Sequence, residues 1–390
     1  MWANTCRISS SRLFHTTVVP EALNRAIIYS QHGSPHDVLR VLTFRDPPSL
    51  PAPNTLTIEF MLAPINPVDL NTIEGSYPVS PKSEPALLSS HGPIFVGGKE
   101  GLAKVVAVGE GVSGFMEGDW VVMYDHRVPT WIKRRNVLAT DLIKLPLTAK
   151  DGLSEVNGAM ITINPPTAYN ILKEYADLQE GHWVIQNGAN SAVGQMVIQV
   201  AKYRKLNTIN FVRQRDDLEA LSQRLQKLGA TKVLTYDDLQ ETSLRNRVQE
   251  WTRGKDIRLA LNCVSGPTTA SMTRLLGPNA HLVSYGAMSK QPLLLPTSLL
   301  VFNNLTAHGF SQARWNGTHP KADLEALVGE LAKMMLDLPG SNNSNLKEPM
   351  HEIVRIADDE SDEAATKKIK DLFKKVIEGK VSKILLKWSQ

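Results

Sequence analysis

Cysteine is scarce in this chain, and its scarcity excludes two kinds of protein. Cys6 and Cys263 are the only two cysteines among 390 residues. A disulfide-dense scaffold, or a zinc site with four thiolate ligands, needs more. Uninterrupted apolar runs of about 18 residues are missing as well, so the sequence predicts no membrane-spanning helix.

An excess of one charge sign is also missing. The chain has 43 Lys and Arg residues against 39 Asp and Glu residues, which gives a formal charge of +4. Such a balance does not mark a nucleic-acid-binding protein. The apolar share of 42% and the charged share of 21% are those of a globular chain. The length predicts two or three domains, and the composition favours an enzyme.

The amino terminus has a composition of its own. It carries no acid before Glu21, although it holds Arg7, Arg12 and a serine cluster at 9–11. An arginine- and serine-rich, acid-poor terminus is typical of a mitochondrial transit peptide. We therefore predict that residues 1–21 direct the protein to the mitochondrial matrix. An ordinary, frayed terminus is the alternative.

From residue 22 to residue 165, short β-like runs are broken by proline and glycine. Within 56–62 every second residue is a large apolar one, which is close to the period of a half-buried strand. Further strand-like runs lie at 102–108 and 120–123. This part of the chain predicts a strand-rich, barrel-like domain.

From residue 166 to about residue 310, strand and helix signals alternate. Amphipathic stretches separate short apolar runs, and in one of them Asp216 is expected to open a helix that Gly229 ends. Alternation of this kind predicts an α/β fold with a doubly wound parallel sheet. The apolar runs predict strands at 183–185, 209–212, 232–235, 259–264 and 281–285.

The last sixty or so residues form a further segment. A polar, loop-like break at 339–345 precedes an acidic stretch at 358–363, and apolar residues at helical spacing then alternate with lysines. Acids at the start and lysines at the end of a helix complement its dipole. We predict a packed amphipathic helix. Nucleic-acid binding by its basic face is the less favoured alternative.

The turn after the first strand of the alternating region carries the cofactor signal. Residues 187–194 read NGANSAVG. Against the G-x-G-x-x-G pattern of dinucleotide-binding folds, the glycine positions hold Ala189, Ser191 and Gly194, so one glycine remains. The context favours a nucleotide site, because a helix amino terminus after a strand can bind phosphate. An ordinary strand-to-helix turn is the alternative.

The end of the next strand distinguishes two cofactors. NAD sites place a carboxylate there to bind the ribose hydroxyls, but this chain has Arg213, Gln214 and Arg215. Guanidinium groups bind a 2′-phosphate, which a carboxylate would repel. We therefore predict NADPH as the cofactor. The alternative is a pair of exposed arginines at a helix start.

Short stretches resemble landmarks of the medium-chain dehydrogenase/reductase superfamily. They are NPVD at 66–69, GGKEG at 97–101, GEGV at 109–112 and LGA at 228–230. The resemblance implies two domains, one of them discontinuous. These are a GroES-like, strand-rich catalytic domain at 22–165 and 338–390, and a Rossmann NADPH-binding domain at 166–337.

The zinc enzymes of this superfamily differ from the chain at the metal site. By the resemblance, their ligands would lie near Asn66, Lys99 and Asn164. Amide and ammonium side chains are poor zinc ligands. We therefore predict metal-free chemistry, and we expect Lys99 and Glu100 to form a structural ion pair.

Longer stretches resemble the mitochondrial trans-2-enoyl-thioester reductases of fatty acid synthesis, from the zinc-free branch of the superfamily. They are INPVDLN at 65–71, EGSYP at 74–78, NGANSAVGQ at 187–195 and RQR at 213–215. The resemblance implies that Tyr77 is catalytic and that the protein is a homodimer. The implied NADPH contacts are Asn164, Asn190, Ser191, Ala192, Val193, Arg213, Gln214, Arg215, Tyr285, Gly286, Ala287, Met288, Phe310, Ser311, Gln312 and Lys383.

The implied reaction needs a hydroxyl donor. NADPH would deliver hydride to Cβ of an enoyl thioester, and the enolate must then be stabilised and protonated at Cα. Without a metal, Tyr77 fits either as the proton donor or as the enolate stabiliser. Two alternatives remain open: a zinc-free NADPH:quinone reductase, which would be indifferent to Tyr77→Phe, and a non-catalytic NADPH- or RNA-binding protein.

The carrier of the acyl group is either acyl carrier protein or coenzyme A. A basic run at Lys133, Arg134 and Arg135 offers a docking surface for the acidic carrier protein or for the phosphates of coenzyme A. A solvated basic turn is the favoured alternative for this run.

Overall fold

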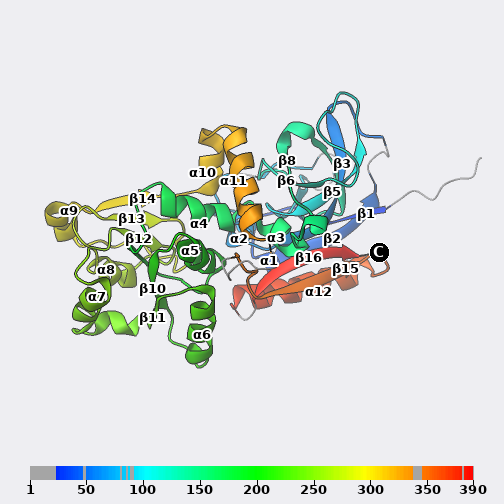
Figure 1. Ribbon diagram of the computed structural model, residues 1–390. Coiled ribbons are helices and arrows are strands. Elements are labelled where there is room, and N and C mark those ends of the chain that lie inside the picture. Colours follow the sequence, from blue (N-terminus) through cyan, green and yellow to red (C-terminus); the bar gives the residue numbers. More distant parts are fainter. Residues whose placement is uncertain are drawn as a thin grey trace, which may run out of the picture.

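The second half of the chain folds around a six-stranded parallel sheet, shown in green and yellow in the ribbon of the computed structural model (Figure 1). In the order in which they lie side by side, its strands are β11 (Lys232–Thr235), β10 (Asn207–Val212), β9 (Trp183–Gln186), β12 (Leu259–Asn262), β13 (His281–Ser284) and β14 (Thr306–Gly309). The chain moves outward in one direction from β9 to β11 and in the other from β12 to β14. Ligands of such sheets bind beside this switch point, at the carboxyl ends of the strands.

Helices connect these strands and cover the sheet. They are α5 (Ala192–Tyr203), α6 (Leu218–Leu228), α7 (Leu244–Thr252), α8 (Pro267–Thr273) and α9 (Thr297–Asn303). The predicted doubly wound α/β fold is confirmed, because every strand pair of this sheet is parallel. Several boundaries differ from the prediction by one or two residues, and two of them have a clear local cause. The helix expected to open at Asp216 begins at Leu218 after an N-cap at Asp217. The strand expected to reach residue 264 ends at Asn262, whose side chain accepts the amides of Val264 and Ser265 and turns the chain.

The first half forms two antiparallel strand systems with the carboxy-terminal segment added to one of them. Its larger sheet follows the order β15 (His351–Ala357), β16 (Lys383–Ser389), β3 (Thr55–Pro64), β5 (Leu102–Val108), β6 (Trp120–Met123) and β8 (Leu142–Lys144), with β7 (Arg134–Leu138) on β3. The smaller sheet is β2 (Arg40–Arg45), β1 (Leu23–Tyr29) and β4 (Phe95–Val96). The short helices of this half are α1 (Pro35–Val38), α2 (Pro67–Ile73) and α3 (Glu155–Met160).

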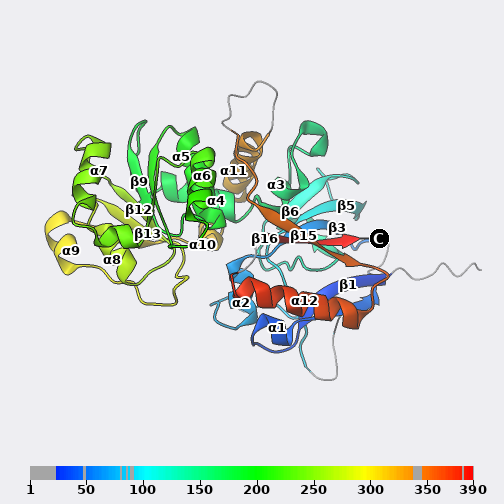
Figure 2. The same cartoon turned by 90° about the horizontal axis from the view of Figure 1, so that it is seen from below.

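The carboxy-terminal segment returns to this strand-rich half. β16 pairs antiparallel with β3 and parallel with β15, and α12 (Asp362–Ile377) connects the two added strands. Figure 2 shows α12 lying along β1 and α1. Its inner face buries Ile369 and Phe373, and its amino-terminal Asp362 pairs with Arg25 at 2.9 Å. The predicted amphipathic helix is therefore packed, and its acidic start is part of the packing. The exact domain boundaries at 165/166 and 337/338 stay a prediction.

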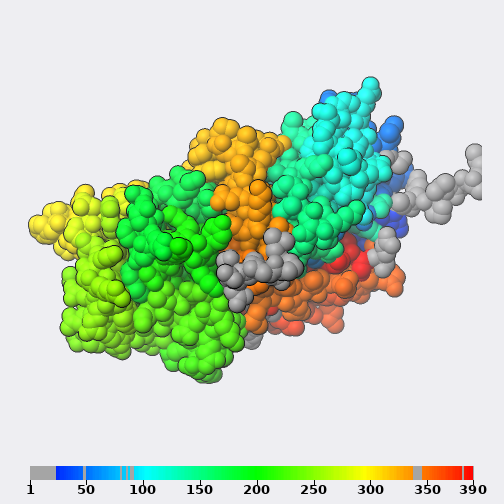
Figure 3. All heavy atoms as spheres, in the orientation of Figure 1, coloured from blue at the N-terminus to red at the C-terminus, as the bar shows by residue number. Residues whose placement is uncertain are grey.

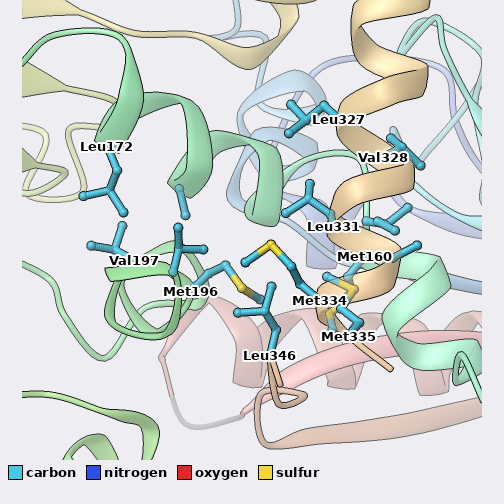
Figure 4. Packing of buried hydrophobic residues seen from close by; sticks show 14 of the residues in the cluster. Met160, Leu172, Met196, Val197, Leu327, Val328, Leu331, Met334, Met335 and Leu346 are labelled. Atoms are coloured by element: carbon cyan, nitrogen blue, oxygen red, sulfur yellow. The ribbon is translucent and has the colours of Figure 1, made fainter. Parts of the chain in front are cut away.

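Three helices lie between the two sheets. They are α4 (Asn164–Lys173), α10 (Gln312–Thr318) and α11 (Lys321–Met334). Figure 4 shows methionines from different elements meeting here: Met160 of α3, Met196 of α5, and Met334 and Met335 at the end of α11, with Leu346 beside them. Unbranched, polarisable methionine side chains fill irregular gaps well. One apolar cluster thus joins the two halves.

The structure describes residues 23–46, 50–79, 81–84, 87, 92–336, 345–379 and 382–389. The predicted transit peptide, and nearly all of the predicted polar break at 339–345, lie outside these residues. Within the described part of the chain, none of the helices has the length and apolar character needed to cross a bilayer.

Candidate active site

The cofactor loop follows β9 and leads into α5. Ser191 is the N-cap of α5, and its hydroxyl oxygen accepts the amide of Gly194 at 3.1 Å. A Cβ at Gly194 would lie 2.7 Å from the carbonyl oxygen of Gly188 and 2.8 Å from the backbone of Ala189. The remaining glycine of the pattern is therefore required, because strand and helix approach too closely for any side chain. The first amides of α5, at Ala192 and Val193, have no acceptor within the helix and suit a phosphate.

The floor of this loop is a polar network that the sequence did not reveal. The Asn187 side chain donates to Asn262 Oδ1 at 2.8 Å and to Thr269 Oγ1 at 3.0 Å, and it accepts the amide of Cys263 at 2.8 Å. The amide of Gly188 donates to the Tyr236 hydroxyl at 2.9 Å. The sequence signal that could have indicated this network is the pair Gln186 and Asn187 at the end of a buried strand, because buried amide side chains need hydrogen-bond partners. The network joins the ends of β9, β11 and β12 under the loop.

The predicted 2′-phosphate readers are exposed at the carboxyl end of β10. Arg213, Gln214 and Arg215 are all exposed. Arg215 pairs with Asp217, with a second contact at 3.1 Å. Arg213 lies near enough to Tyr236 to lower the pKa of that phenol, although burial raises it more. The charge of Arg213 thus acts on the floor of the cofactor loop.

Two further predicted segments follow β13 and β14 at the same edge of the sheet. After β13 come Tyr285, Gly286, Ala287 and Met288, and Met288 is exposed. After β14 come Phe310, Ser311 and Gln312, of which Ser311 is the N-cap of α10. Gln312 is buried and bonded on both sides, to Asn170 at 3.2 Å and to Asn316 at 2.8 Å.

These residues fit a dinucleotide. The four segments at 187–193, 213–215, 285–288 and 310–312 lie along the carboxyl edge of one parallel sheet. The loop offers a helix amino terminus, a glycine where a side chain cannot fit, and an exposed guanidinium pair at the next strand. Anionic phosphates match both the helix terminus and the guanidinium groups.

Tyr77 lies on a turn after α2. Gly75 has φ +78°, and a Cβ there would meet the ring of His32 at 2.9 Å, so the turn needs glycine. The amide of Tyr77 donates to the carbonyl of Asn71 at 3.1 Å. The side chain is half-buried, and desolvation raises the pKa of its phenol.

An ion pair joins the Tyr77 turn to the nucleotide half. Lys290 follows the segment 285–288, and its Nζ lies 3.7 Å from Oε2 of Glu74. Glu74 precedes Tyr77 by three residues. The turn therefore faces the loop that follows β13.

Asn164 and Lys383 lie together in the strand-rich half. Lys383 donates to Asn66 Oδ1 at 2.5 Å and to the carbonyl of Ile65 at 2.9 Å. Asn164 donates to the same Asn66 oxygen at 3.4 Å. Asn164 also lines a cavity with Ala192 and Gln195 of the cofactor loop and helix. Asn164 is thus shared by both halves, whereas Lys383 is separated from the other implied NADPH contacts by Asn66.

The residues at the former metal positions do not fit zinc. Two of the three positions hold the amides of Asn66 and Asn164, which are hydrogen-bonded, and Lys383 also donates to Asn66; the third position, Lys99, lies over the ring of Tyr77. Zinc prefers thiolate, imidazole and carboxylate ligands, and an ammonium group occupies the place of a cation. We therefore derive no step through a metal.

Glu100 has a different partner from the expected one. It is fully buried and accepts hydrogen bonds from Asn66 Nδ2 at 2.9 Å and from the amides of Thr162 and Ile163 at 3.0 and 2.8 Å. Lys383 is its cationic neighbour. The expected Lys99–Glu100 ion pair is wrong, because Lys99 points instead over the ring of Tyr77.

The basic run at 133–135 is not a docking surface. Lys133 pairs with Asp358 at 2.5 Å, Arg134 with Asp46 and Glu59, and Arg135 with Glu84 at 3.3 Å. These side chains are at most one third exposed. Both expectations for the run, docking surface and solvated turn, are wrong, because acids distant in sequence neutralise each of its charges.

Fold and site together define the class of protein. Two family models match the chain: the alcohol dehydrogenase GroES-like domain at residues 52–137 and the zinc-binding dehydrogenase at residues 192–333. A putative NADPH:quinone reductase from Bacillus thuringiensis has the same fold, with a TM-score of 0.73 at 22% identity. The class is that of the medium-chain dehydrogenases/reductases.

The relatives define the family within this class. The mitochondrial enoyl-[acyl-carrier-protein] reductase of Schizosaccharomyces pombe is 35% identical over 96% of this chain and 97% of its own. The enzyme of that name from Xenopus tropicalis is 38% identical over 84% and 87%. The solved Etr1p/NADP/crotonyl-CoA complex has a TM-score of 0.85 at 31% identity and covers 94% of this chain and 100% of its own. The chain belongs to the mitochondrial enoyl-[acyl-carrier-protein] reductases, as the sequence resemblance predicted.

Proposed function

We propose that this enzyme reduces the carbon–carbon double bond of 2-enoyl thioesters with NADPH, and that Tyr77 is its catalytic residue. The observation that carries the proposal is the placement of the Tyr77 turn against the nucleotide half by the Glu74–Lys290 contact at 3.7 Å. The solved relative holds NADP and crotonyl-CoA, a 2-enoyl thioester. A phenol beside a nucleotide site meets the chemical need of this reduction.

The nucleotide half binds the cofactor, and the strand-rich half supplies the proton donor. Bound NADPH supplies a hydride for Cβ of the substrate. The α5 amino terminus and Arg213 bind its phosphates, and the backbone after β13 borders the reaction space. The Tyr77 hydroxyl donates its proton to Cα, so that one C–H bond forms there while its O–H bond breaks. The half-buried position of Tyr77 limits competing proton exchange with water.

Tyr77→Phe tests this assignment. Because only the hydroxyl is lost, we expect kcat for crotonyl-CoA reduction to fall by roughly 10²-fold or more while the Kd of NADPH stays unchanged. NADPH oxidation at 340 nm and cofactor fluorescence measure the two quantities. Full activity of the variant would remove Tyr77 from the reaction. Turnover of quinones but of no enoyl thioester would overturn the proposed function itself.

The natural carrier is acyl carrier protein. The names of the relatives support this carrier, whereas crotonyl-CoA is the thioester in the solved complex. A higher kcat/KM for crotonyl-[acyl-carrier-protein] than for crotonyl-CoA is the expected result. The acid-free amino terminus supports import into the matrix, and fractionation of mitochondria after import tests that location.

The enzyme acts as a homodimer built on the free edge of the parallel sheet. β14 pairs with β13 on one side and, among the described strands, with none on the other. Beside it α9 exposes Leu300, Val301 and Phe302, which are 41%, 65% and 83% exposed. A bare strand edge next to a large apolar patch is typical of an interface. The Etr1p/Etr2p heterodimer of Candida tropicalis shows that a relative forms a two-chain assembly.

A further inference from the structure

Lys99 is a buried cation that the proposed reaction has not yet used. Its side chain is 9% exposed, and its Nζ lies 5.3 Å from the centre of the Tyr77 ring. A buried ammonium group without a role is costly, because it loses its hydration. Its position over the ring of Tyr77 therefore needs a reason.

Two acids near Lys99 favour its charged form. It lines a cavity together with Asp69 of α2 and with Tyr29, His126 and Arg127. Burial lowers the pKa of Lys99, and the carboxylates of Asp69 and Asp125 act against this shift. Burial also lowers the pKa of His126 to about 4, so this imidazole is neutral near pH 7 and does not compete as a cation.

Asp69 is the buried acid that lines this cavity with Lys99, and burial raises the pKa of its carboxyl group to about 7. It is 1% exposed, and one oxygen accepts the amide of Asn66 at 2.7 Å. Its other oxygen, Oδ1, has no hydrogen-bond partner among the described residues, and neither has Nε2 of His126. Two unpartnered buried polar atoms bordering one cavity indicate a polar interior rather than an apolar one.

We propose that Lys99 is the positioning residue that stabilises the phenolate of Tyr77 during the reaction. The inference rests on the proposed function. When Tyr77 gives its proton to Cα, its O–H bond breaks, a C–H bond forms and the negative charge remains on the phenolate. The ammonium group of Lys99 lies over the ring on which that charge is delocalised, and it keeps its own proton. A proton taken up from bulk solvent restores the Tyr77 phenol after product release, so that the reduction consumes one hydride from NADPH and one solvent proton.

Electrostatics give the direction of the effect. Burial raises the pKa of Tyr77, which means that its surroundings disfavour the phenolate. A cation 5.3 Å from the centre of the phenolate ring in a water-poor site offsets this penalty, because charges interact more strongly at low dielectric. The neutral phenol of the resting enzyme gains much less from the same cation. The interaction thus lowers the barrier rather than tightening substrate binding.

Substitutions at Lys99 separate charge from packing. In Lys99→Met, which keeps an unbranched side chain without the charge, we expect kcat with crotonyl-CoA and NADPH to fall about tenfold, with both KM values within about twofold of wild type. Lys99→Arg is expected to retain most of the activity. Lys104→Met removes an exposed charge on β5 and serves as the control. An unchanged kcat, or an effect on KM alone, would overturn the proposal.

The alkaline pH profile provides a second readout. The pKa of Lys99 is lowered from 10.5. As the pH is raised, wild-type kcat should therefore start to fall before pH 10.5 is reached, because Lys99 loses its charge. Lys99→Arg should move this decline upward, because arginine keeps its charge. The titratable groups facing Lys99 are Asp69 on α2, Tyr77 after it, Tyr29 on β1, and Asp125 and His126 after β6, with Lys82 and Arg127 at the cavity rim. Identical alkaline limbs in wild type and Lys99→Arg would contradict the assignment.

A double-mutant cycle links Lys99 to Tyr77. In the Tyr77→Phe background, Lys99→Met should cause no further loss of kcat, whereas an equal fractional loss in both backgrounds would overturn the proposal. If Lys99→Met fails to fold, the double variant Asp69→Asn/Lys99→Met, which removes both charges, takes its place. Its loss of kcat is then compared between the wild-type and Tyr77→Phe backgrounds. A wild-type enzyme that reduces no enoyl thioester would refute the proposed function. An active wild type whose kcat is unchanged by Lys99→Met would refute this inference alone.

Discussion

Single residues decide how closely the chain approaches the cofactor. Gly194→Ala would place a Cβ 2.7–2.8 Å from the backbone of residues 188 and 189, which cannot move aside as a flexible side chain could. We expect a loss of about 1–3 kcal/mol in the free energy of unfolding, together with weaker NADPH binding. Urea denaturation and fluorescence titration measure the two effects.

Gly317→Ala is the matched control for this change. Gly317 lies in α10, and nothing approaches the position of its Cβ within 4 Å. Alanine in an open helical position is expected to stabilise by about 0.5–1 kcal/mol. Equal behaviour of the two variants would show that the close approach at Gly194 carries no energetic weight.

Cofactor choice is also decided at the residue scale. Arg213 is exposed beside the cofactor loop, whereas Arg215 is engaged by Asp217. Charge-assisted hydrogen bonds contribute about 1.5–3 kcal/mol, so Arg213→Gln should weaken NADPH binding by roughly 10- to 100-fold. NADH lacks the 2′-phosphate and should bind both forms alike. A smaller effect is expected for Arg215→Gln, and a parallel loss for NADPH and NADH would exclude 2′-phosphate recognition.

The charge pairings that sequence reasoning missed share one property. Lys133 and Asp358 are 225 positions apart, and Lys383 lies far along the chain from Asn66 and Glu100. Local patterns reveal that a charge is present but not which distant group neutralises it. Tyr77 and Arg213 could be proposed from the sequence because a short motif and a strand end point to them without knowledge of any partner; both assignments stay predictions.

At the scale of elements, the buried pair of Glu100 and Lys383 connects β16 to the start of α4. Glu100 accepts the amides of Thr162 and Ile163, and Lys383 reaches it through Asn66. In Glu100→Gln the ammonium group would lose the larger of its two nearby negative charges and keep only that of Asp69, which should cost up to about 3–5 kcal/mol. Thermal or urea unfolding measures the loss.

Removal of both charges provides the test of this coupling. Glu100→Gln/Lys383→Met should recover part of the stability lost in Glu100→Gln, because no unpaired charge remains. Lys387→Met, which breaks the half-exposed pair of Lys387 with Glu155, should cost no more than about 1 kcal/mol. Strictly additive effects at Glu100 and Lys383 would contradict the coupling.

Elements differ in how far the sequence reveals them. The central strands of the parallel sheet were predicted within one or two residues, because β9 and β12 are continuous buried runs. The strand β15 was missed. It lies at a sheet edge and buries only Ile356, so its sequence lacks a strand-like alternation. Pairing with β16, and not its own pattern, makes it a strand.

At the scale of the whole molecule, the chain crosses between its two halves and then returns. Figure 3 shows the orange and red carboxy-terminal segment beneath the cyan strand-rich half. The return places Lys383 beside Asn66, while α4 leads from that cluster to the nucleotide half. Tyr77 and the carboxyl edge of the parallel sheet are thereby carried by separate bodies that meet through a methionine-rich cluster. Sequence patterns predicted both bodies, but not the contacts that set their orientation.

The free edge of the parallel sheet at β14 determines how two copies of the chain are expected to assemble. A second copy laid antiparallel along β14 would pair the free strand edge and cover Val301 and Phe302 of α9. Phe302→Asp would then place a carboxylate in the centre of a desolvated interface, which costs several kcal/mol per subunit. We expect light scattering to give about twice the chain mass for wild type and one chain mass for the variant, with unchanged circular dichroism. Met116→Asp alters a 64% exposed apolar residue far from this edge and should leave the dimer intact. A wild-type monomer would refute the dimer, whereas a dimeric Phe302→Asp would move the interface to another face.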